Sequence, residues 1–341
     1  MCVLWFSYLQ WLDNHFETQA CLPKERTCVR SIMVQTSKTV FPLVFVWWVA
    51  NGLTSLYSKT EMTEAGKKTS FLEMKWLDLT TMQFLFGVMC SAFSIFFIER
   101  GSMTIPKISD WNSFVVILGN LLGHLSVNVS YTFVSSSATQ VVKSSEPIFM
   151  FFFLVCLKSQ HAAQQNTSSL VLFSIILMVF GTCLFVIWDI TFNVWGILAA
   201  VTSNIAFPLR NIALKNIGRQ YESPFEKYFI LSFFGTLLLF PFLVIKLIIQ
   251  NTTLLHLSQS GIAAASFHCV YNLASISVLQ NVSPLNHAIL NFSKRIFVIT
   301  LNIKYFNLIM TWHMFLGLFV IFLGLALYLF SRNGKTSLNK F

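Results

Sequence analysis

The chain has 341 residues, of which 55% are hydrophobic and 11% are charged. A soluble domain carries about 25% charged residues, so this composition excludes a soluble protein and indicates a polytopic membrane protein. The formal net charge is +10, but four of the cations lie inside apolar segments, whereas nucleic-acid-binding proteins carry theirs on solvated faces. We therefore expect the lipid bilayer as a partner and no nucleic acid.

Ten segments are apolar and long enough to form transmembrane helices, each of which needs about 20 residues to cross the hydrocarbon core. In chain order they are residues 40–58, 79–98, 112–134, 136–157, 168–188, 191–213, 228–245, 258–280, 282–303 and 311–331. The predicted fold is therefore an all-α integral membrane protein. The seven cysteines show no paired spacing, so neither a disulfide framework nor a metal site is predicted.

An internal repeat relates two parts of this predicted bundle. An asparagine follows four residues after His124 and again four residues after His268, and residues 145–149 align with residues 293–297. The matching stretches are five spans apart, and this odd offset inverts the second copy relative to the first. Inverted repeats with a binding site between them are a common plan of secondary transporters.

These patterns divide the chain into regions. We predict two inverted five-helix repeats, at about 40–188 and 191–331, within a ten-span domain at 40–331. More of the loop Lys and Arg residues lie on the side of the two termini than on the opposite side, and positive charge in short loops marks the cytosolic side. The flanking segments, 1–39 and 332–341, are therefore both expected to be cytosolic.

Lys143 lies near the middle of segment 136–157, three residues before Glu146 and four before Pro147. A proline removes the hydrogen bond to the carbonyl four residues earlier and loosens that turn. Lys143 and Glu146 lie on neighbouring faces of a helix, so the two could form a simple structural pair. Because such a pair is a costly way to build a plain helix in lipid, we favour a lysine that Glu146 holds and hands to a bound solute.

Three further polar side chains in the predicted spans are candidates for the same site. Arg210 follows Pro208 near the cytosolic end of its segment, so it is either a topological anchor or a second contact to the solute. His124 and Tyr271 lie near the middle of their segments, where a lone histidine or tyrosine is as readily a packing residue as a site residue. Both lie in the repeat-related stretches, which favours a role in the site.

Lys294 and Arg295 stand side by side in segment 282–303, and no acid lies within four positions of either. A charged side chain in hydrocarbon costs at least about 2.5–3.5 kcal/mol, so such residues face a cavity or a partner, unless one of them snorkels to the interface. We expect a bound anion to neutralise the pair. Arg295 would supply a planar fork for two phosphate oxygens, and Lys294 a compact charge.

Three motifs carry a family resemblance. They are Lys-x-x-Glu-Pro at 143–147, Ser-Asn-x-x-Phe-x-x-Arg-Asn at 203–211, and Ser-Pro-x-x-His followed by Asn-x-x-Lys-Arg at 283–295. They resemble the triose-phosphate and sugar-phosphate translocator family of the drug/metabolite transporter superfamily, and the likeness covers nearly the whole chain from about residue 40. The resemblance implies a solute-binding site formed by Lys143, Lys294, Arg295, His124, Arg210 and Tyr271. The sequence departs from the family pattern at Val127, where a threonine is frequent, and at Gln140, where a histidine is common.

The predicted function is a secondary-active antiporter that exchanges phosphorylated small organic anions (triose phosphate, phosphoglycerate or sugar phosphate) for inorganic phosphate by alternating access. The expected location is an organelle membrane, either a plastid-type envelope or the Golgi or endoplasmic reticulum. The alternative is a nucleotide-sugar transporter of the Golgi or endoplasmic reticulum. We expect no enzyme and no cofactor, because the spans contain no paired acids, no histidine-rich metal set and no Gly-x-Ser-x-Gly nucleophile motif.

Overall fold

The structure of the chain, a computed structural model, describes residues 26–63, 73–98, 111–157, 169–189, 192–217, 223–250, 258–282 and 284–336. Within these ranges all regular secondary structure is helical, which confirms the all-α prediction. The helices are α2 (Arg26–Glu61), α3 (Lys75–Phe97), α4 (Trp111–Phe133), α5 (Ser136–Lys143), α6 (Glu146–Cys156), α7 (Ser169–Ile187), α8 (Val194–Asn216), α9 (Pro224–Gln250), α10 (Gln259–Asn281), α11 (Pro284–Tyr305) and α12 (Trp312–Thr336). Most of the two predicted cytosolic end segments lies outside the described residues.

Each predicted span coincides in position with one of these helices, or with α5 and α6 together. By length and apolar composition, six stretches of the described chain could cross a membrane: Lys75–Phe97, Trp111–Phe133, Ser136–Cys156, Val194–Asn216, Pro224–Gln250 and Gln259–Asn281. Large apolar side chains such as Phe96, Ile248 and Phe319 are exposed on the outer surface, whereas polar ones such as Asn128 and Asn272 are buried between helices. The chain is therefore a multi-pass helical membrane protein.

The segment predicted as one span at 136–157 is broken into two helices. Helix α5 ends at Lys143, a turn follows, and α6 begins at Glu146 with Pro147 in its first turn. The proline has no N–H to donate to the carbonyl of Lys143, so the loosening predicted there becomes a full break. This break places Lys143 and Glu146 on separate helices in the interior of the bundle.

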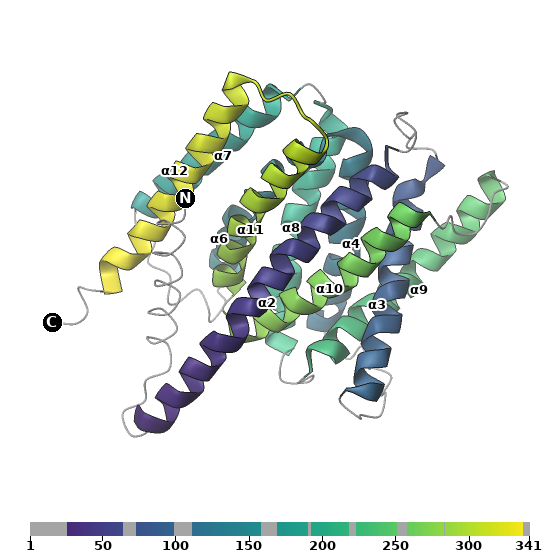
Figure 1. Cartoon of the computed structure of the whole chain (residues 1–341), viewed down its shortest axis with the longest axis horizontal. Coiled ribbons are helices and arrows are strands. Elements are labelled where there is room, and N and C mark those ends of the chain that lie inside the picture. The colour runs from purple at the N-terminus through teal and green to yellow at the C-terminus, as the bar shows by residue number, and fades with distance from the viewer. Residues whose placement is uncertain are drawn as a thin grey trace.

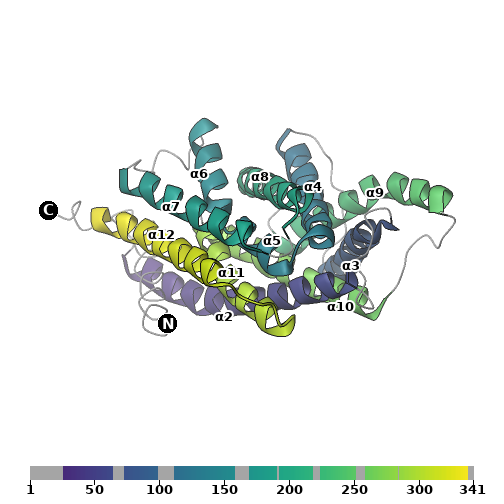
Figure 2. The same ribbon diagram turned by 90° about the horizontal axis from the view of Figure 1, so that it is seen from above.

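The helices from the two halves of the chain interlock in matching pairs. Helix α4 packs along α8, and α10 packs along α2 in the same way. Helix α3 packs against α9, and α7 against α12 (Figure 1). Figure 2 shows α2, α10 and α11 on one side of the bundle, and α4, α6 and α8 on the other. Each of these four pairings is preserved when every helix is exchanged for the one that lies five predicted spans away.

Two of these contacts require glycine. A Cβ atom added to Gly181 on α7 would lie 2.7 Å from the carbonyl oxygen of Gly317 on α12, and the reverse distance is 2.8 Å. Small residues at such crossings let helix backbones approach closely. On α4, a Cβ atom at Gly123 would lie 2.6 Å from the ring of Phe207 on α8, so this glycine makes room for an aromatic ring that points towards the centre of the bundle.

Candidate solute-binding site

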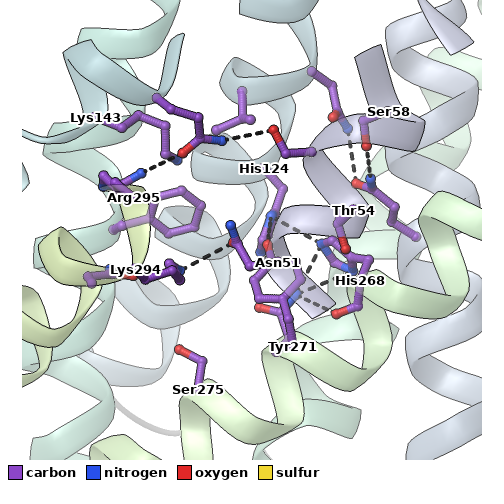
Figure 3. A pocket seen from close by; sticks show the side chains of 18 of the residues that line it. Asn51, Thr54, Ser58, His124, Lys143, His268, Tyr271, Ser275, Lys294 and Arg295 are labelled. Atoms are coloured by element: carbon purple, nitrogen blue, oxygen red, sulfur yellow. Dashed lines mark hydrogen bonds between the residues drawn. The ribbon is translucent and has the colours of Figure 1, made fainter. Parts of the chain in front are cut away.

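A cavity lies between helices of both halves, and its empty space, including the part open to solvent, amounts to about 610 Å³. Its lining comes from α2, α3, α4, α5, α6, α8, α10 and α11. All six site residues predicted from the sequence line it: His124, Lys143, Arg210, Tyr271, Lys294 and Arg295. Figure 3 shows the labelled side chains of Lys143, Arg295 and Lys294 on one side of the pocket, and those of His124, His268 and Tyr271 opposite them. The structure therefore brings the predicted residues together, although they are spread over more than half of the sequence.

The guanidinium of Arg295 is bound by groups from the other half of the chain. Its Nη2 atom lies 2.5 Å from Oε2 of Glu146, and Nη1 donates to Oε1 of Gln140 at 3.0 Å. The amide of Asn291 donates to both carboxylate oxygens of Glu146, at 2.9 and 3.0 Å. Only Nε of Arg295 is buried without a partner among the described residues, so the fork expected to face phosphate is occupied by protein in this state.

This arrangement corrects two predictions. Glu146 pairs with Arg295 and forms no ion pair with Lys143, from which the helix break between α5 and α6 separates it. The expectation that a bound anion neutralises Arg295 is also wrong in this state, because Glu146 does so. This acid lies 149 positions away in the sequence, and a search over neighbouring positions cannot find it.

The two lysines of the cavity are less engaged than the arginine. Nζ of Lys143 lies 4.4 Å from the centre of the Phe207 ring and has no hydrogen-bond acceptor among the residues that the structure describes. Nζ of Lys294 donates to Oδ1 of Asn51 at 3.2 Å and lies 4.4 Å from the centre of the Trp47 ring. Aromatic faces attract a cation without neutralising it, so both ammonium groups retain donors for an anion.

Arg210 is a buried cavity residue. Its Nη1 donates to Asn120 at 2.9 Å, and its Nε and Nη2 donate to Asn211 at 3.1 and 2.8 Å. Its guanidinium carbon lies 4.8 Å from the centre of the Phe207 ring, the same ring that supports Lys143. The interpretation of Arg210 as a topological anchor at the membrane surface is therefore wrong, because only 5% of the residue is exposed.

His124 and Tyr271 belong to one polar cluster. Nδ1 of His124 lies 3.3 Å from Oη of Tyr271 and 3.2 Å from Nε2 of His268. Sequence reasoning treated His268 only as the repeat counterpart of His124, yet it also lines the cavity. The relation between the two histidines was visible in the sequence as a repeat, but their contact depends on how α4 and α10 pack.

The cavity carries excess positive charge. Its lining contains four cations, each no more than 7% exposed, and one carboxylate, Glu146. Three positive charges are therefore uncompensated when the histidines are neutral. Burial excludes the snorkelling alternative for Lys294 and Arg295, of which 4% and 3% are exposed. Coulomb attraction is stronger in such an interior than in water, so the cavity is built to attract an anion.

An uncharged polar wall completes the cavity, and the sequence prediction missed it. It includes Asn51 and Ser55 of α2, Gln83 of α3 and Asn128 of α4. These side chains are common in ordinary helix contacts, so no sequence signal distinguished them. Gln140, which departs from the family pattern, accepts from Arg295 and donates to the hydroxyl of Tyr131 at 2.7 Å. An amide can accept and donate at once, so Gln140 links Arg295 to the uncharged polar wall of the cavity.

A multi-pass helical membrane protein with a cationic internal cavity is the class that the fold and this site define. Residues 39–329 match the sequence profile of the Triose-phosphate Transporter family, so the chain belongs to that family. This confirms the family predicted from the motifs and identifies a transporter rather than an enzyme.

Several curated relatives are phosphate translocators of plants. The triose phosphate/phosphate translocator, chloroplastic, of Pisum sativum is 29% identical over 231 residues, which cover 64% of this chain and 55% of that protein. The phosphoenolpyruvate/phosphate translocator 1, chloroplastic, of Oryza sativa subsp. japonica is 27% identical, covering 68% and 58%. The glucose-6-phosphate/phosphate translocator 1, chloroplastic, of Arabidopsis thaliana is 28% identical, covering 83% and 72%. The chain thus spans little more than half the length of the first two relatives.

A crystal structure that is 13% identical in sequence aligns with 87% of this chain and 99% of its own, with a TM-score of 0.58. At this identity the likeness concerns the fold alone.

Proposed function

We propose that the chain is a secondary-active antiporter that exchanges a phosphorylated small organic anion, of the triose phosphate, phosphoglycerate or sugar phosphate class, for inorganic phosphate. The observation that carries the proposal is the excess of three positive charges in one buried cavity. Lys143 and Lys294 retain free donors, and a phosphate dianion offers several acceptor oxygens to them. The relatives named above are translocators of three different phosphorylated solutes, which supports the same class of solute and a plastid-type envelope as its location.

The fold that we propose for this exchange has ten transmembrane helices in two inverted five-helix repeats, at about 40–188 and 191–331. The symmetric helix pairing supports it, and so do two equivalent lysines. Nζ of Lys59, in the last turn of α2, donates to the carbonyl oxygens of Tyr131 and Val134 at the end of α4, at 2.7 and 2.9 Å. These are the first and third helices of the first half.

The second half repeats this contact. Nζ of Lys215, in the last turn of α8, donates to three carbonyl oxygens at the end of α10, at 2.8 to 3.0 Å. Each lysine therefore satisfies carbonyl groups that a helix C-terminus leaves without an intrahelical partner. A cation at this position also interacts favourably with the helix dipole. A contact of the same kind in each half thus supports the proposed repeat.

The two lysine contacts lie at opposite ends of the bundle. Gly196, at the start of α8, approaches Val134 at the end of α4, so the Lys59 contact is near the start of α8. Lys215 is 19 residues further along α8, which is about 28 Å at 1.5 Å per residue. We infer that alternating access breaks one lysine contact at a time, so that the cavity opens to one side of the membrane and then to the other. On this topology both flanking segments, 1–39 and 332–341, are cytosolic.

The charge of the cavity couples the two solutes. Without an anion, Glu146 compensates Arg295, and Lys143, Lys294 and Arg210 remain uncompensated. Enclosing such charges away from water costs several kcal/mol per ion, so the empty carrier rearranges slowly. A bound phosphate group offsets most of this cost. The carrier therefore crosses its closed state quickly only when it is loaded, and exchange follows.

A competition panel tests the solute class. Purified protein in liposomes loaded with phosphate is supplied with labelled external phosphate, and unlabelled triose phosphates, phosphoglycerate, phosphoenolpyruvate, hexose phosphates and sugar nucleotides compete. We expect one or more of the phosphorylated small anions to compete, and sugar nucleotides not to. Competition by sugar nucleotides alone would replace the proposal with the nucleotide-sugar alternative.

A further inference from the structure

Two histidines meet where the halves of the chain come together. Nε2 of His268 on α10 lies 3.2 Å from Nδ1 of His124 on α4, and their ring centres are 4.5 Å apart. These are the repeat-related histidines of the sequence, and both line the cavity (Figure 3). A neutral imidazole has one donor and one acceptor nitrogen, so this contact requires that one ring donates to the other.

The contact of His268 with Tyr228 favours donation from His268 towards His124. Oη of Tyr228 lies 3.4 Å from Nδ1 of His268. The amide nitrogen of Asn272 can only donate, and it lies 3.0 Å from the carbonyl oxygen of His268 and 3.3 and 3.1 Å from its two ring nitrogens. The shortest of these contacts is to the carbonyl oxygen, so the Asn272 amide donates there. When the Tyr228 hydroxyl donates to Nδ1, the proton of His268 is on Nε2 and points to Nδ1 of His124.

His124 is then left with one donor next to the cavity. Its Nδ1 accepts from His268 and from the hydroxyl of Tyr271, 3.3 Å away, so its own proton is on Nε2. This Nε2 atom is buried and has no hydrogen-bond partner among the described residues. Lys143 and Arg210 both lie over the Phe207 ring that contacts His124, so two cations stand close to this imidazole.

We propose that His268 is a positioning residue: it keeps Nδ1 of His124 as an acceptor, so that the Nε2–H group of His124 donates to an oxygen of the bound phosphorylated anion. The inference rests on the proposed function, because an anion offers the acceptor that the unpartnered N–H requires. Both ring nitrogens of His268 have protein partners, so it acts through His124. Each half of the chain thereby contributes one ring to a single contact with the solute.

Nitrogen-15 NMR of the histidine rings tests the tautomer directly, in labelled protein in lipid nanodiscs. The resonances of His124 are assigned by their loss in His124→Gln. We expect the wild-type protein to carry the proton on Nε2 of His124, and His268→Phe to give a mixture of both tautomers. The same tautomer of His124 in wild type and His268→Phe would overturn the proposal, as would a wild-type proton on Nδ1.

Phosphate exchange in proteoliposomes tests the consequence. We expect His268→Phe to raise the KM for inorganic phosphate at least fivefold with Vmax within twofold, and His268→Gln, whose amide can still donate, to stay within twofold of wild type. The double variant His124→Gln/His268→Phe should be no worse than His124→Gln, because both changes remove one contact. Additive losses would indicate a merely structural role and overturn the proposal. A wild-type protein that exchanges no phosphate would refute the proposed function instead, and the NMR result would still report on the histidine pair.

Discussion

The carboxylate of Glu146 lies 2.5 Å from Nη2 of Arg295, and the two residues belong to opposite halves of the chain. The contact shows that the protein supplies its own anion to one of the cavity cations. Asn291 fixes the carboxylate with two hydrogen bonds, so Glu146 stays in place beside the cavity. Under the proposed function, a solute phosphate competes with an internal carboxylate for Arg295, whereas no carboxylate pairs with Lys143 or Lys294 in the described part of the chain.

Replacing Glu146 by glutamine should strengthen phosphate binding and slow transport. Glutamine keeps the shape and can still accept from Arg295, but the cavity gains one uncompensated positive charge. We expect the Kd for phosphate to fall several-fold and Vmax to fall with it, because release becomes harder. Equilibrium binding of labelled phosphate to the detergent-purified protein measures the first effect. An unchanged or weaker affinity in Glu146→Gln would show that Glu146 does not compete with the solute.

Removing either lysine of the cavity should weaken solute binding. A hydrogen bond to a charged group contributes about 1.5–3 kcal/mol, so Lys143→Met and Lys294→Met should each reduce phosphate affinity on the order of 10- to 100-fold. Lys304→Met is the matched control, because Lys304 is exposed near the end of α11 and does not line the cavity. Affinities equal to that of the control would remove both lysines from the site.

The lysine contacts at the two ends should control opening to opposite sides. Lys59→Met and Lys215→Met each remove donors to helix-terminal carbonyl groups, so each should open one end. A single cysteine at Thr54, which lines the cavity, reports access in an otherwise cysteine-free protein. We expect a membrane-impermeant thiol reagent to label it faster from one face in Lys59→Met and from the other face in Lys215→Met. Faster labelling from the same face in both variants would contradict the inverted arrangement.

Two glycine substitutions should separate site geometry from stability. In Gly123→Ala, the new methyl group meets the Phe207 ring at 2.6 Å and displaces the support of Lys143 and Arg210. In Gly181→Ala, it meets backbone of α12, away from the cavity. Overpacking costs typically 1–3 kcal/mol, so both variants should melt at lower temperature, but only Gly123→Ala should raise the KM for phosphate. A raised KM in both variants would mean that solute binding is also sensitive to helix packing far from the cavity.

The charged part of the site could be predicted from the sequence because a cation in an apolar segment is conspicuous. Lys143, Arg210, Lys294 and Arg295 stand out for this reason, and all four line the cavity. The break after Lys143 was also foreshadowed, since Pro147 cannot donate to its carbonyl. These predictions rest on local chemistry, which a sequence displays.

The partners of these cations could not be predicted, because they depend on how the two halves interlock. Glu146 reaches Arg295 only when α6 packs against α11, and Asn51 reaches Lys294 only through the contact of α2 with α11. Asparagine and glutamine carry no charge, so in the sequence they do not stand out from the many other polar residues. The pairing of Lys143 with Glu146 was wrong for the complementary reason: three-residue spacing brings side chains together only on an unbroken helix.

The most direct test of the account is the efflux of labelled phosphate from proteoliposomes, measured with and without unlabelled phosphate outside. If uncompensated cations hold the empty carrier back, external phosphate should accelerate efflux at least tenfold, and efflux into phosphate-free buffer should stay close to that of protein-free liposomes. Equal rates under the two conditions, well above the protein-free rate, would show that the carrier changes conformation freely with an empty cavity. That result would contradict the claim that the charge of the cavity enforces exchange.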